Sequence, residues 1–254
     1  MSWDPGQYLR FADQRLRPAL DLLLRIDHAN PETIVDLGCG AGNVTAHLKQ
    51  RWPGTIVTGV DNSPEMLERA RTIDADINWE AGELATWRPA QTVTIIYSNA
   101  ALHWADNHAD LLPRLAGFVA KGGMLAVQMP HQNGAPSHQA AFQRANTARW
   151  RQRLEGLTRE SPVAAPQQYY DWLTPHFSAV DIWESEYLQI MRGANPVADW
   201  TRGTFLLPFL DALDDDERAE FEAEYRTLIL QAYPQRSNGN TLFPFRRLFL
   251  IARR

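Results

Sequence analysis

The chain has 254 residues, of which 44% are hydrophobic and 22% charged, and its formal net charge is -5. These values fit one globular domain with a sizeable core, and they exclude a broad basic surface for nucleic acid or an anionic membrane. The single cysteine excludes an internal disulfide, and no stretch nears the roughly 18 apolar residues of a membrane span, so we expect a cytoplasmic chain without a signal peptide.

Residues 1–28 predict an amphipathic helix. Apolar residues recur at helical spacing from Leu16 to Leu23, which gives the helix one broad buried face. Pro18 is expected in its first turn, where a missing N–H costs least.

The segment from Thr33 to Asn43 combines an apolar run, an acid and three glycines at alternate positions. Residues 33–37 predict a strand that carries Asp36, and Asn43 opens a helix after Gly38, Gly40 and Gly42. Such glycines let the backbone adopt positive φ and approach a ligand closely. A dinucleotide fingerprint has the spacing G-x-G-x-x-G and offers its helix N-terminus to a pyrophosphate, whereas here the spacing is G-x-G-x-G. Asp36 would repel a phosphate and attract the ammonium and sulfonium groups of S-adenosylmethionine.

A second predicted strand, residues 57–61, ends in an acid at the distance expected for a ribose-binding carboxylate. That acid is Asp61, about 20 residues beyond the glycine turn. Ser63 and the Pro64 that follows it form a helix start. This connection is short, so we expect Asn62 and Met66 near the ribose and adenine.

These segments resemble motif I and its surroundings in the class I S-adenosylmethionine-dependent methyltransferases. The resemblance implies that the third strand, residues 77–81, is followed by the adenine-binding pair Gly82 and Glu83, where the class commonly carries Asp. It also implies that the leading helix closes over the cofactor, which makes Tyr8 and Arg15 candidates for binding its methionine carboxylate. Cys39, inside the turn, is expected to be a small filler side chain.

The fourth predicted strand, residues 93–97, runs into a segment that ends in His103 and Trp104. Ligands of open parallel sheets bind outside the carboxyl ends of the strands, where the strand order reverses. In the class I order this point lies between strands one and four, so Asn99 and the glycine turn should flank one crevice. His103 and Trp104 are then the best-placed groups to position a substrate, although His103 could instead cap a helix.

The remaining chain predicts helices between the last strands of the sheet. We expect a helix at 108–119 ended by Lys121-Gly122-Gly123, and strands at 124–129, 180–187 and 242–252, the last antiparallel as in this class. Helices are expected at 137–157, 166–173 and within 196–233, including an acidic helix at 214–230 with a solvated charged face. The expected architecture is a single α/β, Rossmann-like domain spanning 1–254, in which the insertions 130–175 and 188–241 cover the substrate.

Within that class the chain resembles the trans-aconitate 2-methyltransferase family over nearly its whole length. The matching segments lie at both ends and at the crevice: residues 3–5, 8–11, 98–104, 128–130, 137–138, 203–204, 208–213 and 242–249. Two positions depart from the family pattern. His103 stands where Gln is expected, and Leu207 stands where the family tends to carry Arg.

This resemblance implies methyl transfer from S-adenosylmethionine to one carboxylate of trans-aconitate, giving a monomethyl ester without a metal. The acceptor is already ionised at pH 7, so no general base is needed. The other two carboxylates need cations, and Arg suits them because its fork binds carboxylates bidentately. The candidates are Arg15, Arg17, Arg149, Arg202, Arg246 and Arg247, with His103, His131 and His138 as weaker options. We favour Arg202 and also select His138 and Arg246 as substrate-binding residues. Arg246 and Arg247 are adjacent on a predicted strand, so their side chains point to opposite faces and at most one points inward.

Three other functions remain open at this stage. The acceptor could be a phenol or an amine, in which case His103 would act as a general base. The chain could be a non-catalytic S-adenosylmethionine sensor or, against the glycine spacing, an NAD(P)-dependent oxidoreductase. Its partners are expected to be small molecules, not nucleic acid or membrane, and its oligomeric state is left open.

Overall fold

The described residues, 12–73, 76–158 and 161–254 of a computed structural model, contain a seven-stranded sheet with the order β3-β2-β1-β4-β5-β7-β6. Its strands are β1 (Thr33–Leu37), β2 (Ile56–Asp61), β3 (Ile77–Ala81), β4 (Val93–Asn99), β5 (Val119–Pro130), β6 (Ala179–Arg192) and β7 (Asn240–Arg253). The pairs β1–β2, β1–β4, β2–β3 and β4–β5 are parallel, and β5–β7 is antiparallel. The predicted fold class is confirmed, and the strand order reverses between β1 and β4.

The chain divides into two compact units. The sheet unit comprises residues 15–131, 162–185 and 247–254, and the helical unit comprises residues 1–14, 132–161 and 186–246. The strands β6 and β7 each run from one unit into the other. Among the described residues, no helix is long and apolar enough to cross a lipid bilayer.

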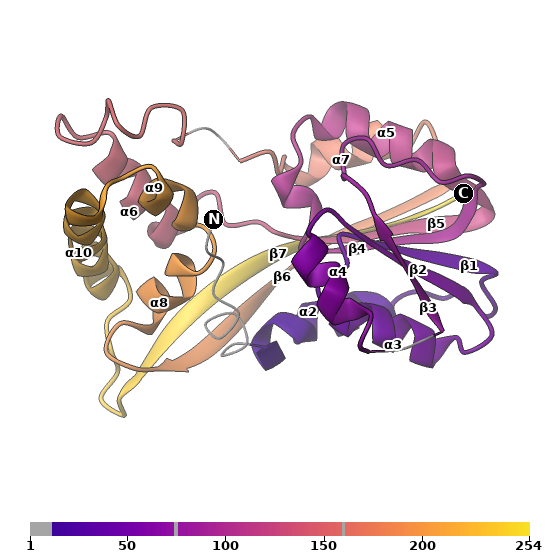
Figure 1. The fold of residues 1–254 in the computed structure, drawn as a ribbon, viewed down its shortest axis with the longest axis horizontal. Coiled ribbons are helices and arrows are strands. Elements are labelled where there is room, and N and C mark those ends of the chain that lie inside the picture. The colour runs from indigo at the N-terminus through magenta and orange to yellow at the C-terminus, as the bar shows by residue number, and fades with distance from the viewer. Residues whose placement is uncertain (1–11, 74–75, 159–160) are drawn as a thin grey trace. The chain divides into compact units, whose positions relative to one another are not determined.

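Helices cover both faces of the parallel strands in the sheet unit (Figure 1). The helices are α2 (Ala12–Leu24), α3 (Asn43–Arg51), α4 (Pro64–Ala70), the short 3-10 helix η1 (Leu102–Trp104), α5 (His108–Phe118) and α7 (Pro166–Leu173). In Figure 1, α5 and α7 lie on one face, and α2, α3 and α4 lie on the other. The Tyr97 hydroxyl of β4 donates to the carbonyl oxygen of Ala19 in α2 at 2.8 Å, which links this helix to the sheet.

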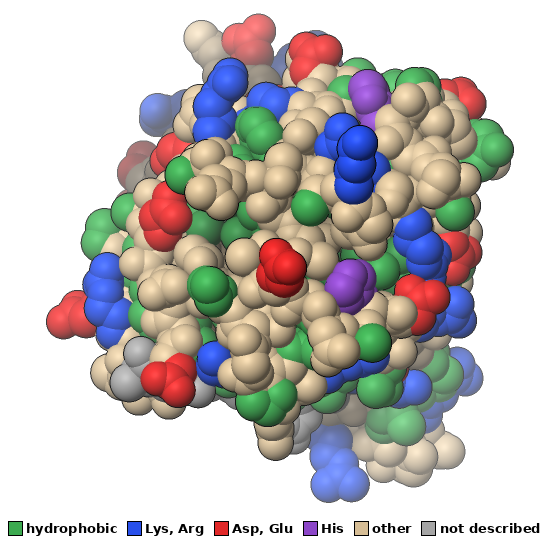
Figure 2. Space-filling view, turned by 90° about the vertical axis from the view of Figure 1, so that its right-hand side faces the viewer, with side chains coloured by type: hydrophobic (Ala, Val, Ile, Leu, Met, Phe, Trp, Pro, Cys, Tyr) green, Lys and Arg blue, Asp and Glu red, His purple; other side chains and the backbone are tan. Residues whose placement is uncertain are grey.

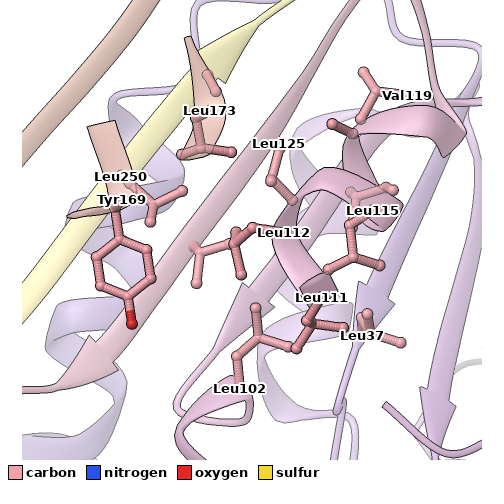
Figure 3. Packing of buried hydrophobic residues seen from close by; sticks show 14 of the residues in the cluster. Leu37, Leu102, Leu111, Leu112, Leu115, Val119, Leu125, Tyr169, Leu173 and Leu250 are labelled. Atoms are coloured by element: carbon pink, nitrogen blue, oxygen red, sulfur yellow. The ribbon is translucent and has the colours of Figure 1, made fainter. Parts of the chain in front are cut away.

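The leucines of α5 form the centre of the sheet-unit core (Figure 3). Leu112 and Leu115 are fully buried against Leu125 of β5, and Leu173 of α7 belongs to the same cluster. Burying a leucine side chain contributes roughly 1.5–3 kcal/mol. This core packs against β4 and β5, whose carboxyl ends carry Asn99 and Gln128.

The helical unit has a separate, aromatic-rich core. Its helices are α6 (Pro136–Ala145), α8 (Pro196–Arg202), α9 (Leu207–Asp211) and α10 (Asp215–Ala232). Trp150, Trp200 and Phe221 are among the buried side chains of this cluster. Trp150 and Trp200 are therefore core residues, in line with the large apolar area that aromatic side chains bury.

The acidic helix is confirmed as α10, but its charged face is not simply solvated. Glutamates of α10 pair with arginines of α6, of the segment after α6 and of α8, and the pairs are Glu217–Arg153, Glu220–Arg149, Glu222–Arg202 and Glu224–Arg144. The sequence pattern missed these pairs because they join residues far apart in the chain.

Three predicted boundaries are wrong. Since α2 begins at Ala12, Pro18 lies inside the helix instead of in its first turn. The helix expected at 137–157 ends at Ala145. The Gly122-Gly123 pair does not end α5, because β5 already begins at Val119; a Cβ on Gly123 would lie 2.4 Å from the Thr94 carbonyl oxygen, so glycine lets β5 approach β4 there.

The segment 166–173 was expected in the substrate cover but belongs to the sheet unit. It forms α7, whose Tyr169 and Leu173 are buried in the core beside α5. The Tyr169 hydroxyl and Nδ1 of His108 are 2.5 Å apart, and Nε2 of His108 lies 2.9 Å from the Leu102 carbonyl oxygen. A carbonyl only accepts, so Nε2 carries the proton and the tyrosine donates to Nδ1.

Candidate functional site

The glycine turn after β1 has the left-handed backbone that its glycines permit. The φ angles of Gly38, Gly40 and Gly42 are 82°, 56° and 81°. A Cβ on Gly38 would lie 2.2 Å from the Cβ of Ala101, so the turns after β1 and β4 touch there. Among the residues that the structure describes, none lies within 4 Å of a Cβ added at Gly40. The turn is therefore closed at Gly38 and open at Gly40, where a ligand can approach the backbone.

Asp61, at the end of β2, joins the glycine turn to the start of α4. Its Oδ2 accepts from the Gly40 N–H at 2.8 Å, and its Oδ1 accepts from the Ser63 N–H at 2.9 Å. Each carboxylate oxygen keeps further acceptor capacity. Because Asp61 is only partly buried, it can still accept from a pair of ligand hydroxyl groups.

Asp36 lies beneath this turn and is only 1% exposed. Its Oδ2 accepts from the Thr45 hydroxyl at 2.6 Å. The pKa of Asp36 is raised to about 7: burial is the main cause, the Thr45 hydrogen bond opposes it, and the Asp61 charge adds to it. The neighbouring Cys39 is buried, and burial raises the pKa of its thiol far above its usual range, which suits the expected filler and not a nucleophile.

The predicted adenine-side residues come together at the ends of β2 and β3. Nδ2 of Asn62 lies 3.3 and 3.2 Å from the two carboxylate oxygens of Glu83. The Gly82 N–H donates to the Asp61 carbonyl oxygen at 3.0 Å, which ties the two connections together. Met66 lies half-buried in the first turn of α4, where its N–H donates to the Ser63 hydroxyl.

Three further cofactor candidates are placed less completely. Asn43 is exposed at the first residue of α3. Tyr8 lies outside the described residues, and of Arg15 only the backbone, within α2, is described. The assignment of Tyr8 and Arg15 to the methionine carboxylate, and of Asn43 to the cofactor, stays a prediction.

The chain turns sharply where β4 ends. Ala100 has a φ of 50°, a left-handed conformation that a residue with a side chain adopts at a cost, and strain of this kind clusters at functional sites. This turn directs the chain into η1, which carries His103 and Trp104. Trp104 is 59% exposed, and its ring centroid lies 4.8 Å from that of His103.

His103 has the properties of a neutral polar group and not of a base. Its pKa is lowered to about 3, mainly by burial and in addition by the positive charge of Arg247 and by the neighbouring His108. A group with so low a pKa is a poor proton acceptor near pH 7. His103 also does not cap α5, because the residue at that N-cap position is Asn107.

The paired arginines of β7 lie on opposite faces, as alternation requires. Arg246 is exposed, whereas Arg247 is 4% exposed, and its Nη1 donates to Oε1 of Gln128 at 3.4 Å. Arg247, and not the Arg246 that we selected as a substrate-binding residue, is thus the buried member of the pair, and the assignment of Arg246 to the substrate stays a prediction. The sequence held a usable signal, because Arg247 shares the strand phase of the aromatic residues Phe243, Phe245 and Phe249.

The other predicted substrate residues belong to the helical unit. Nε of the exposed Arg202 donates to Oε2 of Glu222 at 3.1 Å. The His138 ring stacks on Phe205 with centroids 3.8 Å apart, and burial lowers its pKa to about 4. A substrate carboxylate would have to compete with Glu222 for Arg202. Both assignments stay predictions.

Comparison with known proteins agrees with this arrangement. Residues 8–175 match a family model described as a methyltransferase domain. The trans-aconitate 2-methyltransferase of Azoarcus sp. is 45% identical over 99% of this chain and 98% of its own length. That of Streptomyces coelicolor is 44% identical over 100% of this chain and 87% of its own length.

Solved structures share the fold at low sequence identity. The YcgJ protein of Bacillus subtilis superposes with a TM-score of 0.60 at 12% identity and covers 94% of this chain and 98% of its own. The phosphoethanolamine N-methyltransferase 2 of Haemonchus contortus, solved with S-adenosyl-L-methionine, has a TM-score of 0.56 at 13% identity and covers 93% of this chain and 52% of its own. At these identities the likeness concerns the fold alone.

Proposed function

This chain belongs to the trans-aconitate 2-methyltransferase family, and we propose that it transfers the methyl group of S-adenosylmethionine to one carboxylate of trans-aconitate. The products are a monomethyl ester and S-adenosylhomocysteine. The full-length similarity to relatives of that name carries the proposal. It includes the helical unit, which lies largely outside the part matched by the general methyltransferase model.

The turn after β1 suits S-adenosylmethionine better than a dinucleotide. Residues 38–43 contain no Lys or Arg to neutralise a pyrophosphate, and two acids, Asp36 and Asp61, lie around the turn. We assign Asp61 to the ribose hydroxyls, because its carboxylate lies against the open face at Gly40. Asn62 and Glu83 are assigned to the adenine amino edge. When bound there, the cofactor supplies a methyl group that its sulfonium makes electrophilic.

The role of Asp36 differs from direct contact with a cation. Its carboxylate is covered, so it acts on the cofactor through its charge and through the Thr45 bond that holds the start of α3. With a pKa of about 7, Asp36 is partly ionised at neutral pH. A nearby cation favours the ionised form, so cofactor binding should release a proton from this group.

Methyl transfer to a carboxylate needs position more than proton transfer. The acceptor oxygen is ionised at pH 7 and attacks the methyl carbon in line with the departing sulfur. Holding the two reactants in that geometry can supply roughly 7–11 kcal/mol. The neutral His103 and the exposed ring of Trp104 fit a positioning role, and the low pKa of His103 argues against acceptors that must first lose a proton.

The charge distribution fits a small-molecule substrate. On the face shown in Figure 2, Lys and Arg side chains alternate with Asp and Glu, and neither sign forms a broad field. A net charge of -5 does not attract a trianion by itself, so specific cations at the site must bind the acid. We also propose a cytoplasmic location and no nucleic-acid or membrane partner, on the strength of the buried free thiol and this mixed surface.

A screen with a labelled methyl donor tests this function. The chain is incubated with donor and with trans-aconitate, other di- and tricarboxylates, a phenol and an amine. We expect label in trans-aconitate, and mild alkali should release it as methanol. With the donor saturating, the rate should be flat from pH 6 to pH 8. Transfer only to the phenol or amine, with a rate rising through the pKa of an ordinary histidine, would overturn the proposal. Donor binding without transfer to any acceptor would instead support the sensor alternative.

A further inference from the structure

A group of polar side chains at the carboxyl ends of β4 and β5 is not explained by the fold. Oδ1 of Asn99, Nδ1 of His103 and Nε2 of Gln128 are buried, and none of them makes a hydrogen bond within the part of the chain that the structure describes. Gln128 is fully buried and pairs in register with Asn99. Buried polar atoms are normally satisfied, so three together point to a ligand as their partner.

Arg247 gives this group its charge. It lies opposite Pro130, at the carboxyl end of β5, and its Nη1 donates to Oε1 of Gln128 at 3.4 Å. A guanidinium group only donates, so the amide oxygen of Gln128 must face it, and this leaves the Gln128 NH2 group as a second donor. His103, which is neutral in this setting, can donate through Nδ1 in one of its tautomers.

We propose that Arg247, Gln128 and His103 form the subsite for a carboxylate of the acceptor that is not esterified, with Asn99 at its edge. This inference rests on the proposed function. A cation with one amide and one imidazole donor matches the several acceptor sites of a carboxylate. A bound carboxylate would also explain why an arginine is buried at position 247, since the residues two positions before and after it on β7, Phe245 and Phe249, are aromatic.

A carboxylate could also come from the methionine part of the cofactor, and the sheet order argues against that source. Arg247 lies on β7, which is three strands away from β1 and its glycine turn, in the order β1-β4-β5-β7. At about 4.8 Å per strand, this is a lateral distance of about 14 Å. The acceptor must lie beyond the transferred methyl group, so its carboxylates are better placed to reach Arg247 than the methionine carboxylate of the cofactor.

Two substitutions test the subsite without removing its volume. Arg247→Lys keeps the charge but loses the bidentate fork. Gln128→Glu is isosteric and places a carboxylate beside Arg247, where it competes with the substrate. We expect each to raise the KM for trans-aconitate at least tenfold while the Kd for S-adenosylmethionine, from calorimetry, stays within threefold. Arg88→Gln, which changes an exposed arginine of the same unit, is the matched control and should leave both constants unchanged.

Substrate analogues separate binding from a merely structural role. Itaconate, methylfumarate and glutaconate are each trans-aconitate without one carboxylate. With trans-aconitate, the kcat/KM of the wild type should exceed that of Arg247→Lys at least tenfold. With an analogue that lacks the carboxylate bound by Arg247, the same ratio should be less than threefold. For an analogue that retains it, the difference persists. A ratio that is the same for every acid methylated would overturn the proposal.

The remaining outcomes are also decisive. If Arg247→Lys weakens cofactor binding more than tenfold and leaves the KM unchanged, the subsite binds the methionine carboxylate and the acceptor assignment is wrong. If both variants are folded by calorimetry and have wild-type constants, the cluster binds neither. A wild-type enzyme that methylates no polycarboxylate would instead refute the proposed function, which is a separate failure.

Discussion

The two glycines at the start of the turn should respond differently to the same substitution. Gly38 and Gly40 both have positive φ, 82° and 56°, so replacement by Ala costs about 1–2 kcal/mol of backbone strain at either position. At Gly38 the added Cβ would also lie 2.2 Å from the Cβ of Ala101. Overpacking of this kind costs about 1–3 kcal/mol more. Gly38→Ala should therefore destabilise by about 2–5 kcal/mol, and Gly40→Ala by about 1–2 kcal/mol.

Thermal unfolding and cofactor titration separate the two effects. In a chain of this length, 1 kcal/mol corresponds to about 2–4 °C in Tm, so Gly38→Ala should lower Tm by about 4–20 °C and Gly40→Ala by about 2–8 °C. The added methyl group at Gly40 enters the open side of the turn, so Gly40→Ala should weaken S-adenosylmethionine binding at least tenfold. Equal Tm values for the two variants, or normal cofactor affinity in Gly40→Ala, would refute this description of the turn.

Three further predictions follow from named contacts. Asp61→Asn should weaken S-adenosylmethionine binding about tenfold or more by calorimetry, since hydrogen bonds to a charged group contribute about 1.5–3 kcal/mol, and a Kd within twofold would remove Asp61 from the ribose site. Stability should fall by about 1.4 kcal/mol in total as pH drops from 6.5 to 5. The folded-state pKa values of His103 and His138 are lowered to about 3 and about 4, so unfolding binds up to two protons there, while Asp36, raised to about 7, releases about one. The net slope rises from about 0.3 kcal/mol per pH unit at pH 6.5 to about 1.2 kcal/mol per pH unit at pH 5. A flat or opposite dependence in denaturant titrations at pH 5 and 6.5 would show that these histidines are not buried as described. Arg202→Ala tests the assignment of Arg202 to the substrate. A tenfold rise in the KM for trans-aconitate would place Arg202 at a substrate carboxylate despite its pairing with Glu222, whereas a KM within threefold of the wild type would leave it a structural residue.

The cofactor side of the site could be predicted from sequence because local rules govern it. Glycine spacing and strand ends place Gly40 beside Asp61, and short connections bring Asn62 to Glu83; the structure shows both contacts. The covered position of Asp36 was not foreseen. Its hydrogen-bond partner is the Thr45 hydroxyl, nine residues later in the first turn of α3, and no motif in the sequence indicates this pair.

The substrate side required information that the sequence holds only weakly. The choice between Arg246 and Arg247 depends on which face of β7 is buried. The aromatic residues at alternate positions of the strand indicate that face, whereas the two arginines themselves do not. Arg202 was favoured for its neighbours along the chain, but its partner Glu222 lies 20 residues away on α10. Likewise, the low pKa of His103 results from burial and from Arg247 on a distant strand. Long-range contacts decided each of these cases.

The most direct measurement of the central claim is ester formation itself. The chain is mixed with trans-aconitate and with S-adenosylmethionine that carries carbon-13 in its methyl group, and the products are followed by carbon NMR. We predict that the labelled methyl signal moves to the position of a methyl ester as S-adenosylhomocysteine accumulates in equal amount. Label that stays on sulfur, or that moves to nitrogen or to a phenolic oxygen of another acceptor while trans-aconitate is unchanged, would contradict it.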